Sequence, residues 1–223
     1  MKDAAYLNDL LYSIDTIIFD LGGVIVNIDY MKTQHAFEEL GLTSFGEVYS
    51  QAAQSGLFDL YEKGLADTAT FNKRLRLLVP DFEVSDNDLA DAWNAMILEL
   101  PSRRLDTLAR LKSFYRTFLL SNTNELHIEY LHSRLKMEYG KENLNDYFEK
   151  VYYSYEIHLR KPDREIFEHV LRENGLDPQK TLFIDDTIRH IESAQSIGIH
   201  TIHIGSDIML DELYVVLQKR IGI

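Results

Sequence analysis

The predicted fold depends on the segment Thr16-Ile17-Ile18-Phe19-Asp20-Leu21-Gly22-Gly23-Val24-Ile25-Val26. Its first four residues are apolar or β-branched, which predicts a buried parallel strand over 16–19. The strand ends on Asp20 and is soon followed by two glycines. A buried strand rarely ends on a charge that is neither paired nor used, and ligands of open α/β sheets bind beyond the strand ends. We interpret Asp20 as the reactive residue; a carboxylate that caps the next helix is the alternative.

The composition is that of a globular chain with one domain, or one domain with an insertion. The chain has 223 residues, of which 45% are hydrophobic, and no cysteine, so disulfides and thiolate metal sites are excluded. A net charge of −13 argues against a nucleic-acid partner. Residues 1–15 lack a long apolar core, and no apolar run reaches membrane-spanning length. We therefore expect a cytoplasmic protein without a membrane partner; the sequence indicates no oligomeric state.

Strands and helices alternate along most of the chain. Further strands are predicted at 116–120, 151–154, 181–184 and 201–204, and helices at 3–13, 163–174 and 207–220, with others ending near Tyr139 and Ile197. After Ser102, a helical stripe is formed by Leu105, Leu108 and Leu111. Strands that alternate with helices of this length predict an α/β fold, a Rossmann-like parallel sheet with helices on both faces.

Residues 30–100 break this alternation, because their start signals and periodicity are helical. Ser44-Phe45-Gly46-Glu47 resembles a capping box, Asp67 or Thr68 caps a helix expected to run to Leu78 before Pro80, and Ser85 caps another. The last helix is expected to carry one apolar stripe, formed by Leu89, Ala92, Trp93, Met96, Ile97 and Leu100. The sequence thus predicts an α/β core of residues 1–29 and 101–223 with an inserted helical block of residues 30–100.

Polar side chains follow several of the predicted strands and therefore gather at one edge of the sheet. They are Asp20, Ser121-Asn122, Asp185-Asp186 and, before a helix, Lys161. Three converging carboxylates repel one another unless a cation lies among them, and oxygen ligands favour Mg²⁺ over zinc. A hydroxyl, an amide and a lysine at the same edge are groups that hold a phosphoryl group.

In these motifs the chain resembles the haloacid dehalogenase (HAD) superfamily. The four motifs, in family order, are Ile17-Ile18-Phe19-Asp20, Leu119-Leu120-Ser121-Asn122, Arg160-Lys161-Pro162 and Phe183-Ile184-Asp185-Asp186. Each is weak alone, but four in the right order are specific. The inserted block, residues 30–100, resembles the family's small helical cap, which closes over the site and selects the substrate.

The resemblance implies a Mg²⁺-dependent phosphatase of small phosphorylated metabolites. Asp20 would attack phosphorus and form a phosphoaspartyl intermediate that water hydrolyses. Mg²⁺ would be held by Asp20, the Gly22 carbonyl and Asp186, with Asp185 either a ligand or a support of the ligands.

The remaining motif residues are implied to hold the phosphoryl group. Ser121 would bind a phosphoryl oxygen, Asn122 would help to orient the phosphate, and Lys161 would neutralise charge. Backbone N–H groups of Leu21, Gly22 and Gly23 would cradle the transferred group. A structural interpretation stays open for two of these residues, since Ser121 is also typical of a helix cap and Lys161 of an exposed helix start.

Two positions depart from the family pattern. The family's phosphatases usually carry a second Asp two residues after the nucleophile, where this chain has Gly22, and positioned acid–base help is worth about 10²–10⁴ in rate. Asp29 is a candidate substitute acid, but we favour a hinge or helix-cap role for it. His190 replaces the usual Asp or Asn, and we expect a minor effect on the metal's surroundings.

The departure at Gly22 bears on the substrate and leaves alternatives open. Esters with a good leaving group, such as sugar 1-phosphates, need little protonation, and the motifs are similar to those of bacterial α-D-glucose-1-phosphate phosphatases. A catalytically weakened binding or regulatory protein is one alternative. A metal-independent haloacid dehalogenase is another, against which the pair Asp185-Asp186 argues.

Overall fold

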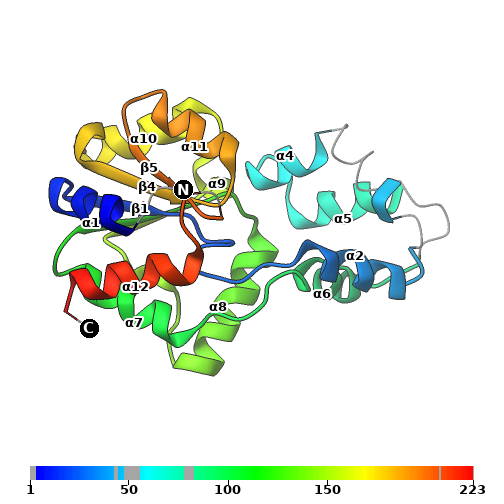
Figure 1. The fold of residues 1–223 in the computed structure, drawn as a ribbon. Coiled ribbons are helices and arrows are strands. Elements are labelled where there is room, and N and C mark those ends of the chain that lie inside the picture. The colour runs from blue at the N-terminus through cyan, green and yellow to red at the C-terminus, as the bar shows by residue number, and fades with distance from the viewer. Residues whose placement is uncertain (1–3, 43–44, 48–55, 78–82, 206, 223) are drawn as a thin grey trace.

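The computed structural model describes residues 4–42, 45–47, 56–77, 83–205 and 207–222 (Figure 1). Their main feature is a five-stranded parallel sheet in the order β3-β2-β1-β4-β5. The strands are β1 Thr16–Phe19, β2 Arg116–Ser121, β3 Lys150–Tyr153, β4 Thr181–Asp185 and β5 His200–His203. The predicted α/β fold class with a Rossmann-like parallel sheet is confirmed, and strand ends deviate by at most one residue.

Both faces of the sheet are buried, which explains why its strands are apolar without alternation. On β1, Ile17 and Phe19 contribute to one hydrophobic cluster and Ile18 to the other. The first cluster contains side chains of α1 Ala4–Ser13, α7 Ser102–Leu111, α8 Glu125–Tyr139 and α12 Leu210–Arg220. The second contains those of α10 Arg164–Asn174 and α11 Ile188–Gln195. Helices therefore cover both faces, as predicted (Figure 1).

Short helices complete the α/β part of the chain. They are η1 Leu144–Tyr147, α9 Ser154–Ile157 and η2 Pro178–Lys180. Helix α9 follows β3 directly, so Ser154, predicted as the end of the strand, begins a helix instead.

The inserted segment is helical and has a hydrophobic cluster of its own. Its helices are α2 Tyr30–Glu39, α4 Leu57–Glu62, α5 Thr68–Leu77 and α6 Asp86–Asn94, and they lie to one side of the sheet in Figure 1. The cluster is rich in aromatic side chains, including Phe37, Tyr61, Phe71 and Trp93. Ser85 caps α6 by accepting from the Asp88 N–H at 3.2 Å, as predicted.

The predicted extension of α6 to Leu100 is wrong. The helix ends at Asn94, and the following residues run extended beside the other connection to the core, with a β-bridge between Ile28 and Ile97. The Asn27 N–H donates to the Glu99 carbonyl at 3.0 Å, and the Leu98 N–H donates to the Asn27 carbonyl at 2.9 Å.

The apolar stripe that suggested one long helix serves two different cores. Leu89 and Trp93 belong to the cluster of the helical block, and Leu100 to that of the sheet. Two strand-like connections, paired around Ile28 and Ile97, join the helical block to the sheet.

Two sequence expectations lie outside the described residues. They are the capping box that starts at Ser44 and the end of a helix at Leu78 and Pro80. Within the described residues, no helix is long and apolar enough to cross a membrane.

Candidate active site

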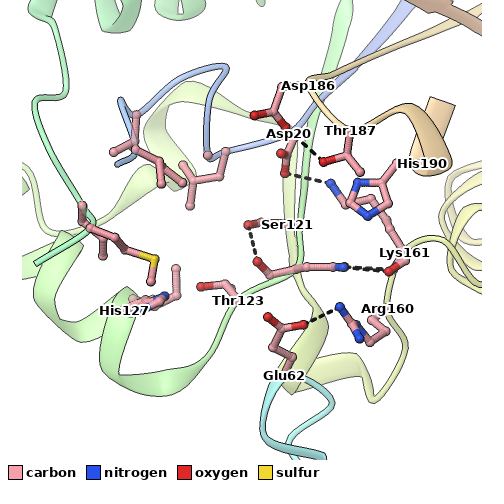
Figure 2. A pocket seen from close by; sticks show the side chains of 18 of the residues that line it. Asp20, Glu62, Ser121, Thr123, His127, Arg160, Lys161, Asp186, Thr187 and His190 are labelled. Atoms are coloured by element: carbon pink, nitrogen blue, oxygen red, sulfur yellow. Dashed lines mark hydrogen bonds and ion pairs between the residues drawn. The ribbon is translucent and has the colours of Figure 1, made fainter. Parts of the chain in front are cut away.

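The order of strands in the sheet places β1 at the centre, so the ends of its neighbours β2 and β4 meet beside Asp20. The strand β1 pairs with β2 on one side and with β4 on the other, and the Asp20 N–H donates to the Ile184 carbonyl at 2.9 Å. Carboxylate oxygens of Asp20, Asp185 and Asp186 all lie within 4.8 Å of one another. The predicted gathering of these three acids at one sheet edge is therefore present. Figure 2 shows two of them, Asp20 and Asp186, side by side.

Lys161 connects two of these acids. Its side chain is fully buried, and its ammonium lies 2.8 Å from Asp20 Oδ1 and 2.7 Å from Asp185 Oδ2. An exposed lysine at a helix start is thus excluded for Lys161. A buried ammonium needs such partners, because a charge without them is expensive in a low-dielectric interior.

Asp185 is held by neighbours on both of its oxygens. Oδ1 accepts the Thr187 N–H at 2.7 Å, and His190 Nδ1 lies 3.1 Å from Oδ1 and 3.0 Å from Oδ2. With Lys161 on Oδ2 as well, both oxygens already have donors. His190, which departs from the family pattern, therefore supports Asp185.

Asp186 is oriented differently, toward the loop after β1. Thr187 donates to its Oδ1 at 3.3 Å, and a methyl group at Gly23 would lie only 2.1 Å from its Oδ2. Gly23 has a positive φ of 70°, so glycine serves both the turn and this close approach.

The pKa values of these acids follow from burial and charge. Burial, with help from Asp185 and Asp186, raises the pKa of Asp20 to about 7 despite Lys161. Burial raises the pKa of Asp185 too, but Lys161 and His190 outweigh it, and the net pKa lies below the ordinary value. A cation among Asp20 and its neighbours relieves this repulsion, so the donor set fits a divalent ion with hard oxygen ligands.

The residues after β2 lie beside the acids. Ser121 is buried at the end of the strand, and its hydroxyl makes only a long 3.4 Å contact with the Asn122 carbonyl. Asn122 forms two hydrogen bonds with the Lys161 backbone, donating to its carbonyl at 2.7 Å and accepting from its N–H at 2.8 Å. Asn122 thus fixes the segment that carries the lysine.

The next helix, α8, is capped by Asn124, whose Oδ1 accepts the His127 N–H at 3.1 Å. The alternative that Ser121 caps this helix is therefore wrong. The cap, Asn124, stands three residues further along the chain than Ser121.

In the loop after β1, one of the backbone N–H groups expected to cradle a phosphoryl group is already used, and the space beside Gly22 is filled. The Gly23 N–H donates to the Val26 carbonyl at 2.9 Å, so it is not free to cradle a phosphoryl group. A methyl group at Gly22 would meet Cδ1 of Ile28 at 2.2 Å, so Ile28 fills the space beside it.

Asp29, considered as a substitute acid, caps a helix. Its carboxylate accepts the Met31 N–H at 2.9 Å at the start of α2.

A cavity of about 350 Å³ opens above these groups, between the sheet edge and the helical block. Asp20, Gly22, Ser121, Lys161 and Asp186 line it. One wall is apolar and consists of Val26, Ile28, Met96, Ile97, Ile128 and Leu131. Polar lining residues that the sequence did not single out are Tyr30, Glu62, Thr123, Arg160, Thr187 and Arg189.

Comparison with known proteins agrees with this arrangement. The family model for haloacid dehalogenase-like hydrolases matches residues 14–198. The chain belongs to the haloacid dehalogenase-like hydrolase family. The family resemblance and the enzyme class, a hydrolase, are thus confirmed.

The HAD-like hydrolase also has relatives of moderate identity. It is 35% identical over 188 residues to D-ribitol-5-phosphate phosphatase of Bacteroides thetaiotaomicron, which covers 84% of this chain and 90% of the relative. A HAD family enzyme of that bacterium, solved as an aspartate-to-alanine mutant with magnesium and inorganic phosphate, has a TM-score of 0.82 at 34% identity over 90% of this chain and 98% of that chain. A HAD-like family hydrolase of Porphyromonas gingivalis has a TM-score of 0.77 at 29% identity, over 86% of this chain and 91% of that chain.

The HAD-like hydrolase also places a histidine, His127, in the cavity wall. Its Nε2 lies 3.3 Å from the Trp93 carbonyl, and its ring stacks on the Trp93 ring at 5.5 Å. Asn124 Nδ2 lies 3.3 Å from Nδ1, which makes Nδ1 the acceptor and Nε2–H the donor. Burial lowers the pKa of His127 to about 4. His127 is therefore a neutral ring that joins α8 to α6.

The low pKa of His127 predicts a pH-dependent stability. The unfolded chain binds a proton at the ordinary pKa of 6.5, and the folded chain only at about 4, so the free energy of unfolding falls as the pH drops through this interval. Between pH 7 and pH 4.5 we expect the free energy of unfolding of His127→Gln to fall by about 1–3 kcal/mol less than that of the wild type. The measurement is urea unfolding of both proteins at pH 7 and pH 4.5.

The matched control is His35→Gln, at an exposed position on α2. It should follow the wild-type pH dependence. If His127→Gln also follows that dependence, His127 is not a neutral buried ring.

Proposed function

We propose that the protein is a Mg²⁺-dependent phosphatase of small phosphorylated metabolites, of the sugar or polyol phosphate type. The observation that carries this proposal is the fully buried Lys161 between Asp20 and Asp185, with carboxylate oxygens of Asp20, Asp185 and Asp186 within 4.8 Å of one another. The arrangement supplies a nucleophile, a neutralising cation and an oxygen-rich metal site beside one cavity. The family assignment and a phosphatase relative at 35% identity support the same reaction.

In the proposed reaction Asp20 attacks phosphorus, and the bond to the leaving oxygen breaks. Lys161 holds Asp20 by Oδ1, which leaves Oδ2 to attack. The resulting phosphoaspartyl group is then hydrolysed by water, which returns Asp20 and releases phosphate. Ser121 donates to a phosphoryl oxygen, the Leu21 and Gly22 amides cradle the group, and Asn122 acts by fixing Lys161.

The donor set fits Mg²⁺, which would be held by the Asp20 and Asp186 side chains and the Gly22 carbonyl. Because both oxygens of Asp185 already accept from Lys161, Thr187 and His190, we assign Asp185 to supporting the ligands. The bound ion supplies positive charge that offsets the negative charge of the phosphoryl group.

The substrate proposal combines the cavity with the relatives. The apolar wall suits the carbon face of a sugar or polyol, and the cavity volume of about 350 Å³ suits a small ester. The relative acts on D-ribitol 5-phosphate, as its name says, and the motifs resemble those of glucose-1-phosphate phosphatases. D-ribitol 5-phosphate and α-D-glucose 1-phosphate are therefore the substrates to test first.

We further propose that residues 30–100 act as a cap that closes the cavity. Glu62 and Met96 of this block line the cavity together with the core. Arg160, next to Lys161, pairs with Asp59 of α4 at 2.9 Å. Cytoplasmic location and the absence of nucleic-acid and membrane partners stay predictions from the sequence.

Replacement of the nucleophile tests the reaction. With Mg²⁺ present we expect turnover of p-nitrophenyl phosphate and of D-ribitol 5-phosphate, and Asp20→Asn should reduce both by at least about 10³-fold, since it removes the attacking carboxylate. Chelation of the metal should abolish turnover reversibly. Phosphate release is the measurement.

The alternatives predict other outcomes in the same assay. No turnover across a panel of phosphate esters would favour a weakened binding protein. Halide release from 2-haloacids that survives chelation would instead favour a dehalogenase.

The space beside Gly22 indicates which substitutions can restore the general acid that the family's phosphatases carry at this position. Gly22→Asp alone places its Cβ against Ile28 Cδ1, whereas Gly22→Asp with Ile28→Val removes that atom. We expect the double variant to hydrolyse alkyl phosphates at least about 10-fold faster relative to p-nitrophenyl phosphate, because an alkoxide leaving group needs a proton. The ratio of kcat/KM for the two esters is the measurement.

Ile28→Val alone is the control, and it should leave the alkyl-to-aryl ratio as in the wild type. An unchanged ratio in the double variant would mean that another group already protonates the leaving oxygen.

A further inference from the structure

We infer that Glu62 and Arg160 form a hydroxyl-binding pair that selects phosphate esters of polyhydroxylated compounds. The inference rests on the proposed phosphatase function and assigns the substrate contact of the same cavity. Glu62 lies in the inserted block, outside the four sequence motifs. Arg160 is the first residue of the third motif, but the family resemblance assigned a role only to Lys161.

The two residues come from different parts of the chain and meet in the cavity wall. Glu62 is the last residue of α4, and its Oε2 lies 2.7 Å from Arg160 Nη2. Both line the cavity that Asp20 and Ser121 also line. In Figure 2 they lie across from Asp20 and Asp186, with Ser121 and Thr123 between them. A substrate with its phosphoryl group at Asp20 therefore directs its remaining atoms toward this pair.

The pair keeps unused hydrogen-bonding capacity. Arg160 Nε is buried and has no hydrogen-bond partner within the described part of the chain, and the contact of Glu62 Oε2 is its 2.7 Å ion pair with Arg160 Nη2. Buried polar atoms normally find a partner, so the Arg160 guanidinium keeps one N–H donor beyond its two ion pairs. Burial also raises the pKa of Glu62, which agrees with a carboxylate removed from bulk water.

The chemistry of the pair fits hydroxyl groups. A carboxylate accepts from a hydroxyl and a guanidinium donates to one, so two neighbouring hydroxyls satisfy both groups at once. A phosphoryl group would be repelled by Glu62 and attracted by Lys161, which orients the ester with its phosphate at Asp20. The apolar wall at Ile28 and Ile97 is left for the carbon chain.

The other partner of Arg160 supplies a matched control. Asp59 lies 2.9 Å from Arg160 Nη1, but it is not among the residues that line the cavity. Asp59→Asn therefore removes a carboxylate from the same guanidinium without removing a group that faces the ligand.

The test compares two five-carbon esters that differ in hydroxyl groups, D-ribitol 5-phosphate and n-pentyl phosphate. Binding of each to the Mg²⁺-loaded Asp20→Asn protein is measured by calorimetry, and kcat/KM is measured in the otherwise wild-type protein. Glu62→Gln should lower the affinity and kcat/KM for D-ribitol 5-phosphate about 10- to 100-fold more than those for n-pentyl phosphate. The reason is that it removes charge-assisted hydrogen bonds to the hydroxyl groups. Glu62→Asp, which keeps the charge but shortens the side chain, should also lose the preference, and Asp59→Asn should keep the wild-type preference.

The outcomes separate this inference from the proposed function. Equal weakening of both esters by Glu62→Gln, or a loss of preference in Asp59→Asn, would reduce the pair to a structural contact and overturn the inference. The same holds if the wild-type protein binds both esters equally. Absence of Mg²⁺-dependent turnover of p-nitrophenyl phosphate would instead contradict the proposed function, and the calorimetric comparison would still decide the role of Glu62.

Discussion

The ion pairs of one buried ammonium hold the site together. Lys161 lies between Asp20 and Asp185, its side chain fully buried, and a buried charge in a low-dielectric interior is tolerated only with such partners. Removal of one partner of a buried pair typically costs about 3–5 kcal/mol. The loop that carries Lys161 is therefore fixed twice, by the two carboxylates and by the amide of Asn122 on its backbone.

In this arrangement the three acids have different surroundings. Asp185 is surrounded by donors, and Asp186 directs Oδ2 toward the loop after β1, where Gly23 permits close approach. Burial that is only partly compensated raises the pKa of Asp20 to about 7, which shows how much the acids need a further cation. The helical block closes the other side of the cavity through Glu62 and through the contact of His127 with Trp93.

Much of the fold was predictable because strand and helix patterns are local. The run 16–19 is buried on both faces, as its continuous apolar pattern indicates, and the end of α8 at Tyr139 agrees with the prediction. The predicted helix from Ser85 to Leu100 failed for a non-local reason. Residues beyond Asn94 pair with the connection around Ile28, and an apolar stripe does not reveal that its members enter different cores.

The sequence by itself determined the family, the parallel sheet and the set of acids, serine and lysine at its edge. It could do so because these residues stand in short contiguous motifs, most of them directly at the ends of predicted strands. Only the tertiary structure decided which contacts these groups and their neighbours make. Asn122 binds the Lys161 backbone, Gly23 uses its own N–H in the turn, and Ile28 fills the space beside Gly22. Glu62 and Arg160 are about a hundred residues apart, and no local pattern marks a pair that exists only once the helical block packs against the sheet edge.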